Sequence, residues 1–209
     1  MANNLGILIS GRGSNMQAIL SAISSGTLCA NASLVLSHRS DAPGLAIATG
    51  NGIPTQVVLP EDYDTRDAYE WALVEALKQA SVDLVVLAGY MKLVGVPMLQ
   101  TFSGRMVNIH PSLLPSFKGL HAQKQALDYG VTMSGCTAHY VIEAMDAGPI
   151  ILQAGVPVYP HDTVDTLSHR ILAEEHRVFP LAIQLALNAL GLKDRHNRYQ
   201  NGGSHESIN

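Results

Sequence analysis

The chain has 209 residues, enough to bury the core of one domain, or of two small ones at most. Hydrophobic residues make up 47% of it and charged residues only 14%, a balance typical of a well-buried α/β enzyme. The net charge of −4 excludes the broadly basic surface of a nucleic-acid-binding protein, although it allows a local basic site for a phosphate.

The first half of the chain alternates strand-like with helix-like segments. Short apolar runs predict strands over residues 5–10, 32–37, 55–59 and 83–88. Helical spacing predicts a helix capped by Ser14, a second over residues 43–49, and a third from Asp64 or Thr65 to Lys78. This alternation indicates βαβ units, right-handed crossovers and a mostly parallel sheet.

The second half departs from that alternation. Residues 137–141 and 150–158 are strand-like, but their link is too short for a crossover helix, so we expect an antiparallel pair. A final helix begins at a cap on Asp162 or Thr163, and Pro180 is expected to kink it without ending it. The predicted fold is therefore an α/β, Rossmann-like open sheet, mostly parallel and flanked by helices, with at least one antiparallel strand in the C-terminal half.

Domain limits and location follow from composition. We expect one domain over residues 1–192 and a polar, mobile tail over residues 193–209. Cys29 and Cys136 lie far apart in no metal-like spacing, which favours free thiols. The residues at the start lack the basic and long apolar segments typical of a secretory signal, and no apolar run approaches the roughly 20 residues that span a bilayer. We therefore expect a cytoplasmic protein with no membrane partner.

The sequence NIHPSLLP at residues 108–115 is the most informative motif. Residues two apart at a strand end project to the same side, so Asn108 and His110 present an amide and an imidazole to one small space. An imidazole exchanges a proton near neutral pH, and an amide N–H holds a developing oxyanion. The prolines beside Ser112 do not resemble a nucleophile elbow, which favours direct acyl-type transfer between two bound substrates.

Asp146 lies in a turn-rich link between two predicted strands. The chain can return it to the strand end that carries His110, where a carboxylate orients an imidazole and moves a proton. Two other interpretations stay open. These residues can be hydrogen-bonding turn residues, or they can join His121 and His139 at a metal, although their spacing matches no standard zinc pattern.

A glycine-rich loop, GRGSN at residues 11–15, separates the first strand from the first helix. Such a loop can bind an anion with its backbone and with the helix N-terminus. A dinucleotide fingerprint needs a third glycine where Met16 stands, and the Gly-Lys-Ser/Thr of a triphosphate loop is absent. A single phosphomonoester held by Gly13, Ser14 and Asn15 remains, with an ordinary βα turn as the alternative.

These motifs together resemble the folate-dependent formyltransferase family. The resemblance rests on HPSLLP at residues 110–115, on Asn108 and Gly119 around it, and on the Asp-x-Gly-Pro sequence at residues 146–149. The opening ISGRGSNM at residues 9–16 is similar to the branch of the family that acts on glycinamide ribonucleotide.

The resemblance covers about residues 5–190 and implies a reaction. The formyl group of 10-formyltetrahydrofolate, the co-substrate, passes to the amine of glycinamide ribonucleotide through a tetrahedral intermediate, as one step of purine synthesis and without a metal. By motif position, the catalytic residues are Asn108, His110 and Asp146, and the 5′-phosphate lies on Gly13, Ser14 and Asn15. Glu175 matches an acidic residue that contacts the acceptor.

A larger set of positions matches the folate site, where an apolar slot with backbone donors holds the pteridine. The matching residues are Arg66, Met91, Lys92, Leu93, Val94, Val141, Glu143 and Ala144. Residues up to about 100 then form a phosphate-binding half, and residues from about 101 to 192 a catalytic and folate half. Lys92 and Leu172 depart from the family's arginine and glutamine, and the first exchange changes bidentate geometry.

Three rival functions use parts of the same site. A formyltetrahydrofolate hydrolase would use the same trio with water as acceptor, but such proteins carry an N-terminal regulatory domain. Transfer to methionyl-tRNA would need a C-terminal domain and a basic surface. An inert binding protein would keep the phosphate loop alone. We therefore expect only small-molecule partners, and the sequence leaves the oligomeric state open.

Overall fold

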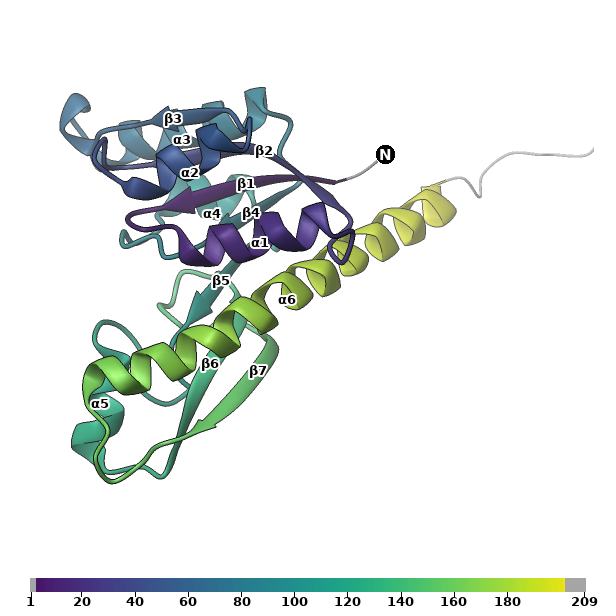
Figure 1. Cartoon of the computed structure of the whole chain (residues 1–209). Coiled ribbons are helices and arrows are strands. Elements are labelled where there is room, and N and C mark those ends of the chain that lie inside the picture. Colours follow the sequence, from purple (N-terminus) through teal and green to yellow (C-terminus); the bar gives the residue numbers. More distant parts are fainter. Residues whose placement is uncertain (1–2, 202–209) are drawn as a thin grey trace, which may run out of the picture.

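The computed structural model describes residues 3–201, and the side chains of residues 3–191. One seven-stranded sheet, in the order β3-β2-β1-β4-β5-β6-β7, runs through the molecule (Figure 1). Its strands are β1 (Asn3–Ile9), β2 (Ala30–Ser37), β3 (Thr55–Val57), β4 (Leu84–Leu87), β5 (Met106–His110), β6 (Met133–Tyr140) and β7 (Ile150–Pro157). The first five strands are parallel to one another, whereas β6 is antiparallel to both β5 and β7. The predicted fold class is confirmed.

Helices cover both faces of the sheet. They are α1 (Ser14–Ser24), α2 (Pro43–Gly50), α3 (Arg66–Gln79), α4 (Val96–Thr101), α5 (Ala122–Tyr129) and α6 (Val164–Asn201), with a 3-10 turn at Pro60–Asp62. Residues of α1, α2, α5 and α6 pack in one hydrophobic cluster with the sheet, and residues of α3 and α4 pack in the other. The short helices α4 and α5 were not predicted, and the six residues of α4 are too few to show a helical period.

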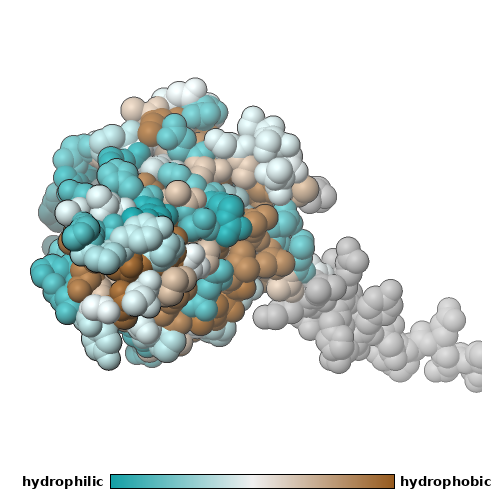
Figure 2. Space-filling model, turned by 60° about the horizontal axis from the view of Figure 1, so that its bottom comes forward, coloured by the Kyte–Doolittle hydropathy of each residue, from teal (hydrophilic) through white to brown (hydrophobic). Residues whose placement is uncertain are grey.

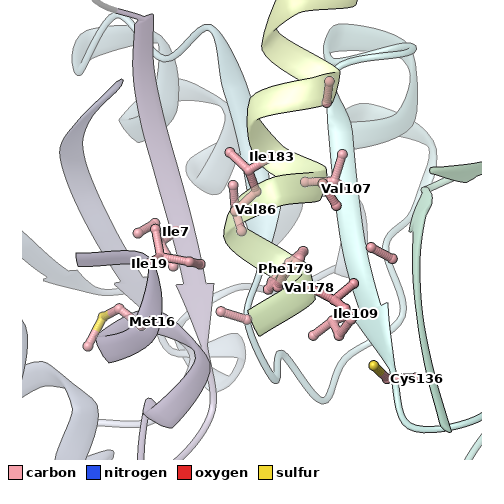
Figure 3. Packing of buried hydrophobic residues seen from close by; sticks show 14 of the residues in the cluster. Ile7, Met16, Ile19, Val86, Val107, Ile109, Cys136, Val178, Phe179 and Ile183 are labelled. Carbon is pink, nitrogen blue, oxygen red and sulfur yellow. The ribbon is translucent and has the colours of Figure 1, made fainter. Parts of the chain in front are cut away.

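The central strands are buried on both faces, which explains their continuous apolar sequences. Ile7 and Ile9 of β1 belong to the cluster under α1 and α6, and Leu8 between them belongs to the cluster under α3. Figure 3 shows Phe179 and Ile183 of α6 over the sheet. Because the long helix spans several strands, it fixes the parallel and antiparallel parts of the sheet relative to each other.

The helix caps agree only in part with the sequence analysis. Thr65 caps α3 by accepting the N–H of Ala68, as expected. Thr163 likewise accepts the N–H of Thr166 at the start of α6. The predicted cap at Ser14 is wrong, because Gly13 holds the cap position of α1 in a left-handed conformation, without a side-chain hydrogen bond. Ser14 is instead the first residue of the helix.

Helix α6 continues through Pro180 and reaches Asn201, beyond the domain limit predicted at residue 192. Part of the segment expected to be a tail is therefore helical, and residues 202–209 lie outside the described residues. The division of the domain into two halves stays a prediction. Between residues 3 and 201, no helix is long and apolar enough to cross a membrane.

The surface is mixed in character. Figure 2 shows hydrophobic residues reaching the surface among hydrophilic ones on the face that comes forward there. Several large apolar side chains are exposed in the part of the chain that the structure describes, among them Leu120, Met133 and Ile150. Isolated residues of this kind are normal on protein surfaces.

Candidate active site

The sheet order places the candidate site at the carboxyl ends of β1, β4 and β5. Strand β1 lies between β2 and β4, so the chain leaves β1 toward one side of the sheet and later returns to the other. In open α/β sheets, ligands bind in the crevice outside such a switch point. The glycine-rich loop follows β1, and the NIHPSLLP motif includes the end of β5.

The pairing of β5 with β6 gathers polar side chains on one face. Asn108 lies directly opposite His139, and His110 lies opposite Thr137. Opposed residues of an antiparallel pair share a face, and so do residues two apart along a strand. Asn108 Nδ2 is 3.2 Å from His139 Nε2. Thr137, in contrast, bonds the backbone of Ser112 and Leu114 and supports the loop after β5.

Asp146 lies in the link between β6 and β7, in a left-handed backbone conformation with φ of 49°. Its Oδ2 is 3.3 Å from His110 Nδ1, and its Oδ1 is 3.6 Å from His139 Nε2. The same Oδ2 accepts the N–H of Gly119 at 2.8 Å. The structure thus brings the predicted trio together around one carboxylate, which contacts two imidazoles.

The surroundings of Asp146 favour the ionised form of its carboxyl group. Burial by itself raises the pKa of Asp146. Contact with His139 and the N–H of Gly119 lowers that pKa, and so do the charges of the two histidines. The lowering outweighs the effect of burial, so the pKa of Asp146 lies below its ordinary value and the group is ionised at neutral pH.

His110 is almost fully enclosed, with 5% of its surface exposed. While Nδ1 faces Asp146, Nε2 lies 2.9 Å from the carbonyl oxygen of Phe117. Oxygen atoms therefore face both ring nitrogens, an environment that suits an imidazolium with two N–H donors. Ser112 Oγ donates to the carbonyl of Ser116, so this hydroxyl is engaged and does not face the histidine as a nucleophile would.

Sequence reasoning missed two parts of this cluster. His139 was considered only as a metal ligand, and its contact with Asp146 was not foreseen. The carbonyl of Phe117 gave no sequence signal, since every residue has one. The alternation of Thr137 and His139 along β6 was a usable signal, but only once the partner strand and its register are known. Among residues 3–201, no group of three or more His, Cys, Asp or Glu is placed to hold a metal.

The glycine-rich loop at residues 11–15, called the phosphate loop from here on after its predicted ligand, is shaped by close backbone packing. Gly13 has φ of 75°, and a Cβ atom there would lie 3.0 Å from the Cα of Gly44 at the start of α2. The N–H of Gly44 donates to the carbonyl of Gly11 at 3.0 Å, which holds α2 against the loop. Because no side chain caps α1, the first N–H groups of that helix, those of Ser14 and Asn15 among them, remain available to an anion.

Asn15 connects the loop to α6. Its Nδ2 donates to Glu175 Oε2 at 2.7 Å, and both side chains are buried. Burial raises the pKa of Glu175, and the hydrogen bond from Asn15 opposes that effect. The structure therefore brings two predicted acceptor residues into contact. The side chain of Asn15 is engaged with the helix, which leaves its backbone N–H for an anion.

Arg66, the first residue of α3, contacts the segment 91–94 that follows β4. Arg66 Nη2 donates to the carbonyl of Leu93 at 2.9 Å, and Nε lies 3.3 Å from Oε1 of the buried Glu70. The side chains of Met91 and Leu93 are 69% and 63% exposed, and exposed apolar groups close together are typical of a surface that binds a ligand. Lys92 Nζ lies 6.0 Å from the centre of the Tyr69 ring.

A cavity of about 670 Å³ lies between α4 with the residues after it and the link that leads from the end of β6 toward β7. Val141 and Glu143 from the predicted folate set line it, together with Val96, Leu99, Gln100, Ser103, Gly104, Tyr140, Ile142 and Pro149. Its size suits a small organic molecule. Two other members of the set lie elsewhere, since Val94 packs against the core and Ala144 is exposed in the link before β7.

Known proteins similar to this chain include both single-function and larger ones. It is 48% identical over 179 residues to the trifunctional purine biosynthetic protein adenosine-3 of Bos taurus. The matched region covers 86% of this chain but only 18% of that protein. The chain thus spans less than a fifth of this larger relative. It is 40% identical to the phosphoribosylglycinamide formyltransferase of Escherichia coli (strain K12), with 86% of this chain and 85% of that protein covered.

Solved structures agree with this likeness. Glycinamide ribonucleotide transformylase 1 from Symbiobacterium toebii superposes with a TM-score of 0.88 at 50% sequence identity, covering 90% of this chain and 89% of that one. The sequence model of the formyl transferase family matches residues 3–183. With the family pattern over most of its length and full-length relatives of the same fold, the chain belongs to the formyl transferase family.

Proposed function

We propose that the protein transfers the formyl group of 10-formyltetrahydrofolate to the amine of glycinamide ribonucleotide. The products are formylglycinamide ribonucleotide and tetrahydrofolate. The observation that carries the proposal is the cluster of Asn108, His110 and ionised Asp146 at the carboxyl end of β5. Relatives of matching length that are named phosphoribosylglycinamide formyltransferase support this choice of acceptor.

The reaction begins with the neutral acceptor amine, whose lone pair attacks the formyl carbon. The carbonyl electrons move to oxygen, where the imidazolium of His110 and the amide of Asn108 stabilise the negative charge. An amide nitrogen carries two N–H donors, so Asn108 can bond the oxyanion while it stays near His139. The Nε2–H of His110 exchanges its bond to the Phe117 carbonyl for one to the oxyanion.

Proton transfer then completes the exchange. Asp146 orients His110 through Nδ1 and takes the proton that the attacking amine loses, directly or through one water. The oxyanion re-forms the carbonyl as the bond between the formyl carbon and N10 breaks. N10 takes up the proton that Asp146 accepted, directly or through the same water, and leaves as the neutral N–H amine of tetrahydrofolate. The side chains contribute hydrogen bonds and proton transfer to these steps, and the proposal needs neither a covalent enzyme intermediate nor a metal.

The acceptor lies on the phosphate loop in this proposal. Backbone N–H groups at Gly13, Ser14 and Asn15 and the Ser14 hydroxyl hold the 5′-phosphate, helped by the positive end of the α1 dipole. Glu175, beside Asn15, contacts the rest of the nucleotide. This places the phosphate at the end of β1, so that the amine at the other end of the acceptor can extend toward His110.

The donor lies on the opposite side of the crevice. Its pteridine enters the cavity lined by Val141 and Glu143, with Ala144 in the link above it. The segment Met91, Lys92, Leu93 and Val94 flanks the donor, and the exposed apolar side chains of this segment provide contact area. Arg66 contributes a positive charge for the acidic end of the folate.

One assay tests the proposal. The protein is mixed with 10-formyltetrahydrofolate, with and without glycinamide ribonucleotide, and tetrahydrofolate release is followed. Release that depends on the acceptor, together with formation of its formylated product, is expected. Tetrahydrofolate release without the acceptor would indicate a hydrolase. No release in either mixture would indicate a protein that binds its ligands without catalysis. A His110→Ala variant serves as the control for background deformylation.

A further inference from the structure

Ser10, directly after β1, joins three segments of the chain. Its hydroxyl oxygen accepts the N–H of Met91 at 2.7 Å, across 81 positions of sequence. The same oxygen lies 3.2 Å from Nδ1 of His38, which directly follows β2. The side chain is nearly buried, with 9% of the residue exposed. One hydroxyl therefore connects chain segments at the ends of three strands.

The sheet order explains why these segments meet. Strands β2, β1 and β4 are neighbours and parallel, so their carboxyl ends lie side by side. Ser10 leads directly into the phosphate loop that begins at Gly11, and Met91 opens the segment 91–94 after β4. The hydrogen bond thus joins the chain segment that would bind the acceptor to the one that would bind the donor.

The segment 91–94 depends on such a bond for its position. Met91 and Leu93 are 69% and 63% exposed, so these side chains do not anchor it by packing. Val94 packs against the core at the end of the segment, whereas the backbone at Met91 and Leu93 is held by two side-chain hydrogen bonds, from Met91 N–H to Ser10 and from Arg66 to the Leu93 carbonyl. Met91 lies beyond the end of β4, where the strand ladder supplies no acceptor for its N–H.

His38 supports the hydroxyl from the other side. Burial, with the positive charges of Lys92 and Arg39, lowers its pKa, and Glu61 opposes this shift more weakly. A neutral imidazole with its proton on Nε2 accepts the Ser10 O–H at Nδ1, which directs the oxygen lone pairs toward Met91. The ring of Tyr90 packs edge-on against the imidazole, with centres 5.4 Å apart.

We propose that Ser10 is a positioning residue that links the phosphate loop to the segment 91–94, so that binding of the acceptor and binding of the formyl donor support each other. The inference rests on the proposed function for the identity of the two ligands. It adds a residue that touches neither ligand and acts through the backbone N–H of Met91. The coupling is reciprocal, because each ligand stabilises the arrangement that the other one needs.

Kinetics of Ser10→Ala provide the first test. Both KM values are expected to rise about tenfold, because the bond holds the segment equally in the ground and transition states. The kcat is expected to stay within about twofold, because the catalytic trio is untouched. Ser10→Thr keeps the hydroxyl and should restore both KM values, whereas unchanged KM values in Ser10→Ala would overturn the proposal.

A matched control separates positioning from stability. Ser134, on β6, is likewise buried, but its hydroxyl has no hydrogen-bond partner in the structure. Ser134→Ala removes the same atoms and should leave both KM values unchanged. If Ser10→Ala and Ser134→Ala alter the KM values alike, the effect of Ser10 is a general loss of packing and the proposal fails.

Hydrogen exchange tests the link without any assay of turnover. In Ser10→Ala the amides of residues 91–94 should exchange at least about tenfold faster than in the wild type. Glycinamide ribonucleotide should slow their exchange in the wild-type protein but not in the variant. Equal protection in both proteins when the nucleotide is bound would overturn the link. Absence of nucleotide binding to the wild type, detected by calorimetry, would instead refute the proposed acceptor, and the exchange rates without ligand would still test the bond.

Discussion

The phosphate loop and the catalytic cluster lie at the same edge of the sheet but are built in opposite ways. The loop is defined by backbone, with Gly13 in a left-handed conformation against Gly44 and uncapped N–H groups at the start of α1. The cluster is defined by side chains, because Asn108, His110 and Asp146 meet through their functional groups. In the proposed mechanism the loop holds a phosphate whose charge does not change during the reaction, whereas the cluster stabilises an oxyanion and moves a proton.

This contrast determines which substitutions each region tolerates. A backbone site accepts many changes of side chain but not an added Cβ where the chain is left-handed and tightly packed. A side-chain site loses its chemistry when one functional group changes, even if the shape is kept. Substitutions in the cluster should therefore act on kcat, and those in the loop on the KM for the acceptor.

The largest effect is expected from Asp146→Asn. The amide cannot accept a proton or stabilise the imidazolium of His110, so kcat should fall about 100- to 10,000-fold at nearly unchanged KM. Steady-state kinetics with both substrates measure this change. Asp128→Asn, in an exposed carboxylate paired with Lys124, is the matched control and should have normal kinetics. A normal kcat in Asp146→Asn would exclude the carboxylate from proton transfer.

A smaller effect in the same cluster is expected from His139→Ala. His139 contacts both Asp146 and Asn108 but does not reach the reacting atoms in the proposed mechanism. Its loss removes one contact from each partner, and kcat should fall about tenfold, the factor that corresponds to one hydrogen bond to a charged group. Kinetics of the single and double variants with Asp146→Asn measure the coupling. Additive effects would show that His139 acts independently of Asp146.

The sequence predicts the parallel part of the fold well, because local patterns determine it. Apolar runs that alternate with helical spacing lead directly to β1, β2, β4 and their crossover helices. The short link between residues 141 and 150 predicts the antiparallel pair β6 and β7. Asn108 and His110 were placed on one face by the period of a strand alone, and the structure has them on β5 as neighbours of His139 and Asp146.

What the sequence does not predict depends on contacts between distant segments. His139 gains its place only through the register between β5 and β6. Asn15 meets Glu175 across 160 positions, so no local pattern shows that its side chain is engaged with α6. The cap of α1 was assigned to Ser14 from residue preference, but the packing of Gly13 on Gly44 moves the cap back by one residue.

In the loop, Gly13→Ala should raise the KM for the acceptor about tenfold and leave kcat nearly unchanged. A left-handed conformation costs a residue with a Cβ about 1–2 kcal/mol, and the added atom would lie 3.0 Å from Gly44 Cα. Gly11→Ala is the control, since its Cβ would meet nothing within 4 Å. If the control raises KM as much, the requirement is for small residues in general and not for the backbone of Gly13.

Ser14→Ala should have a weaker effect in the same direction. The hydroxyl is one donor among several backbone N–H groups, so its loss is worth about 1 kcal/mol and should raise the KM for the acceptor about fivefold. The KM for 10-formyltetrahydrofolate, measured at saturating acceptor, should not change, because Ser14 does not contact the donor in the proposed function. An unchanged acceptor KM would mean that the phosphate is held by backbone alone, which would sharpen the contrast between loop and cluster.

The smallest effect is expected in the stability of Glu175→Gln as a function of pH. Glu175, on α6, supports the loop through its hydrogen bond with Asn15, and burial raises the pKa of Glu175 in the folded protein. The folded state therefore binds a proton more tightly than the unfolded chain does. The resulting stabilisation is complete below the unfolded pKa, about 4.5, and is lost as the pH rises toward the folded pKa.

Glutamine does not ionise, so the variant lacks the loss of stability that the ionisation of Glu175 causes as the pH rises. Thermal unfolding between pH 4 and pH 8 should show the stability of Glu175→Gln rising relative to the wild type as the pH increases. His176, whose pKa is lowered by burial, changes the stability of both proteins alike, so the difference between the curves isolates Glu175. Parallel curves would mean that Glu175 ionises equally in the folded and unfolded states. The loop would then receive no support from a buried proton on α6, and its order would come from glycine packing alone.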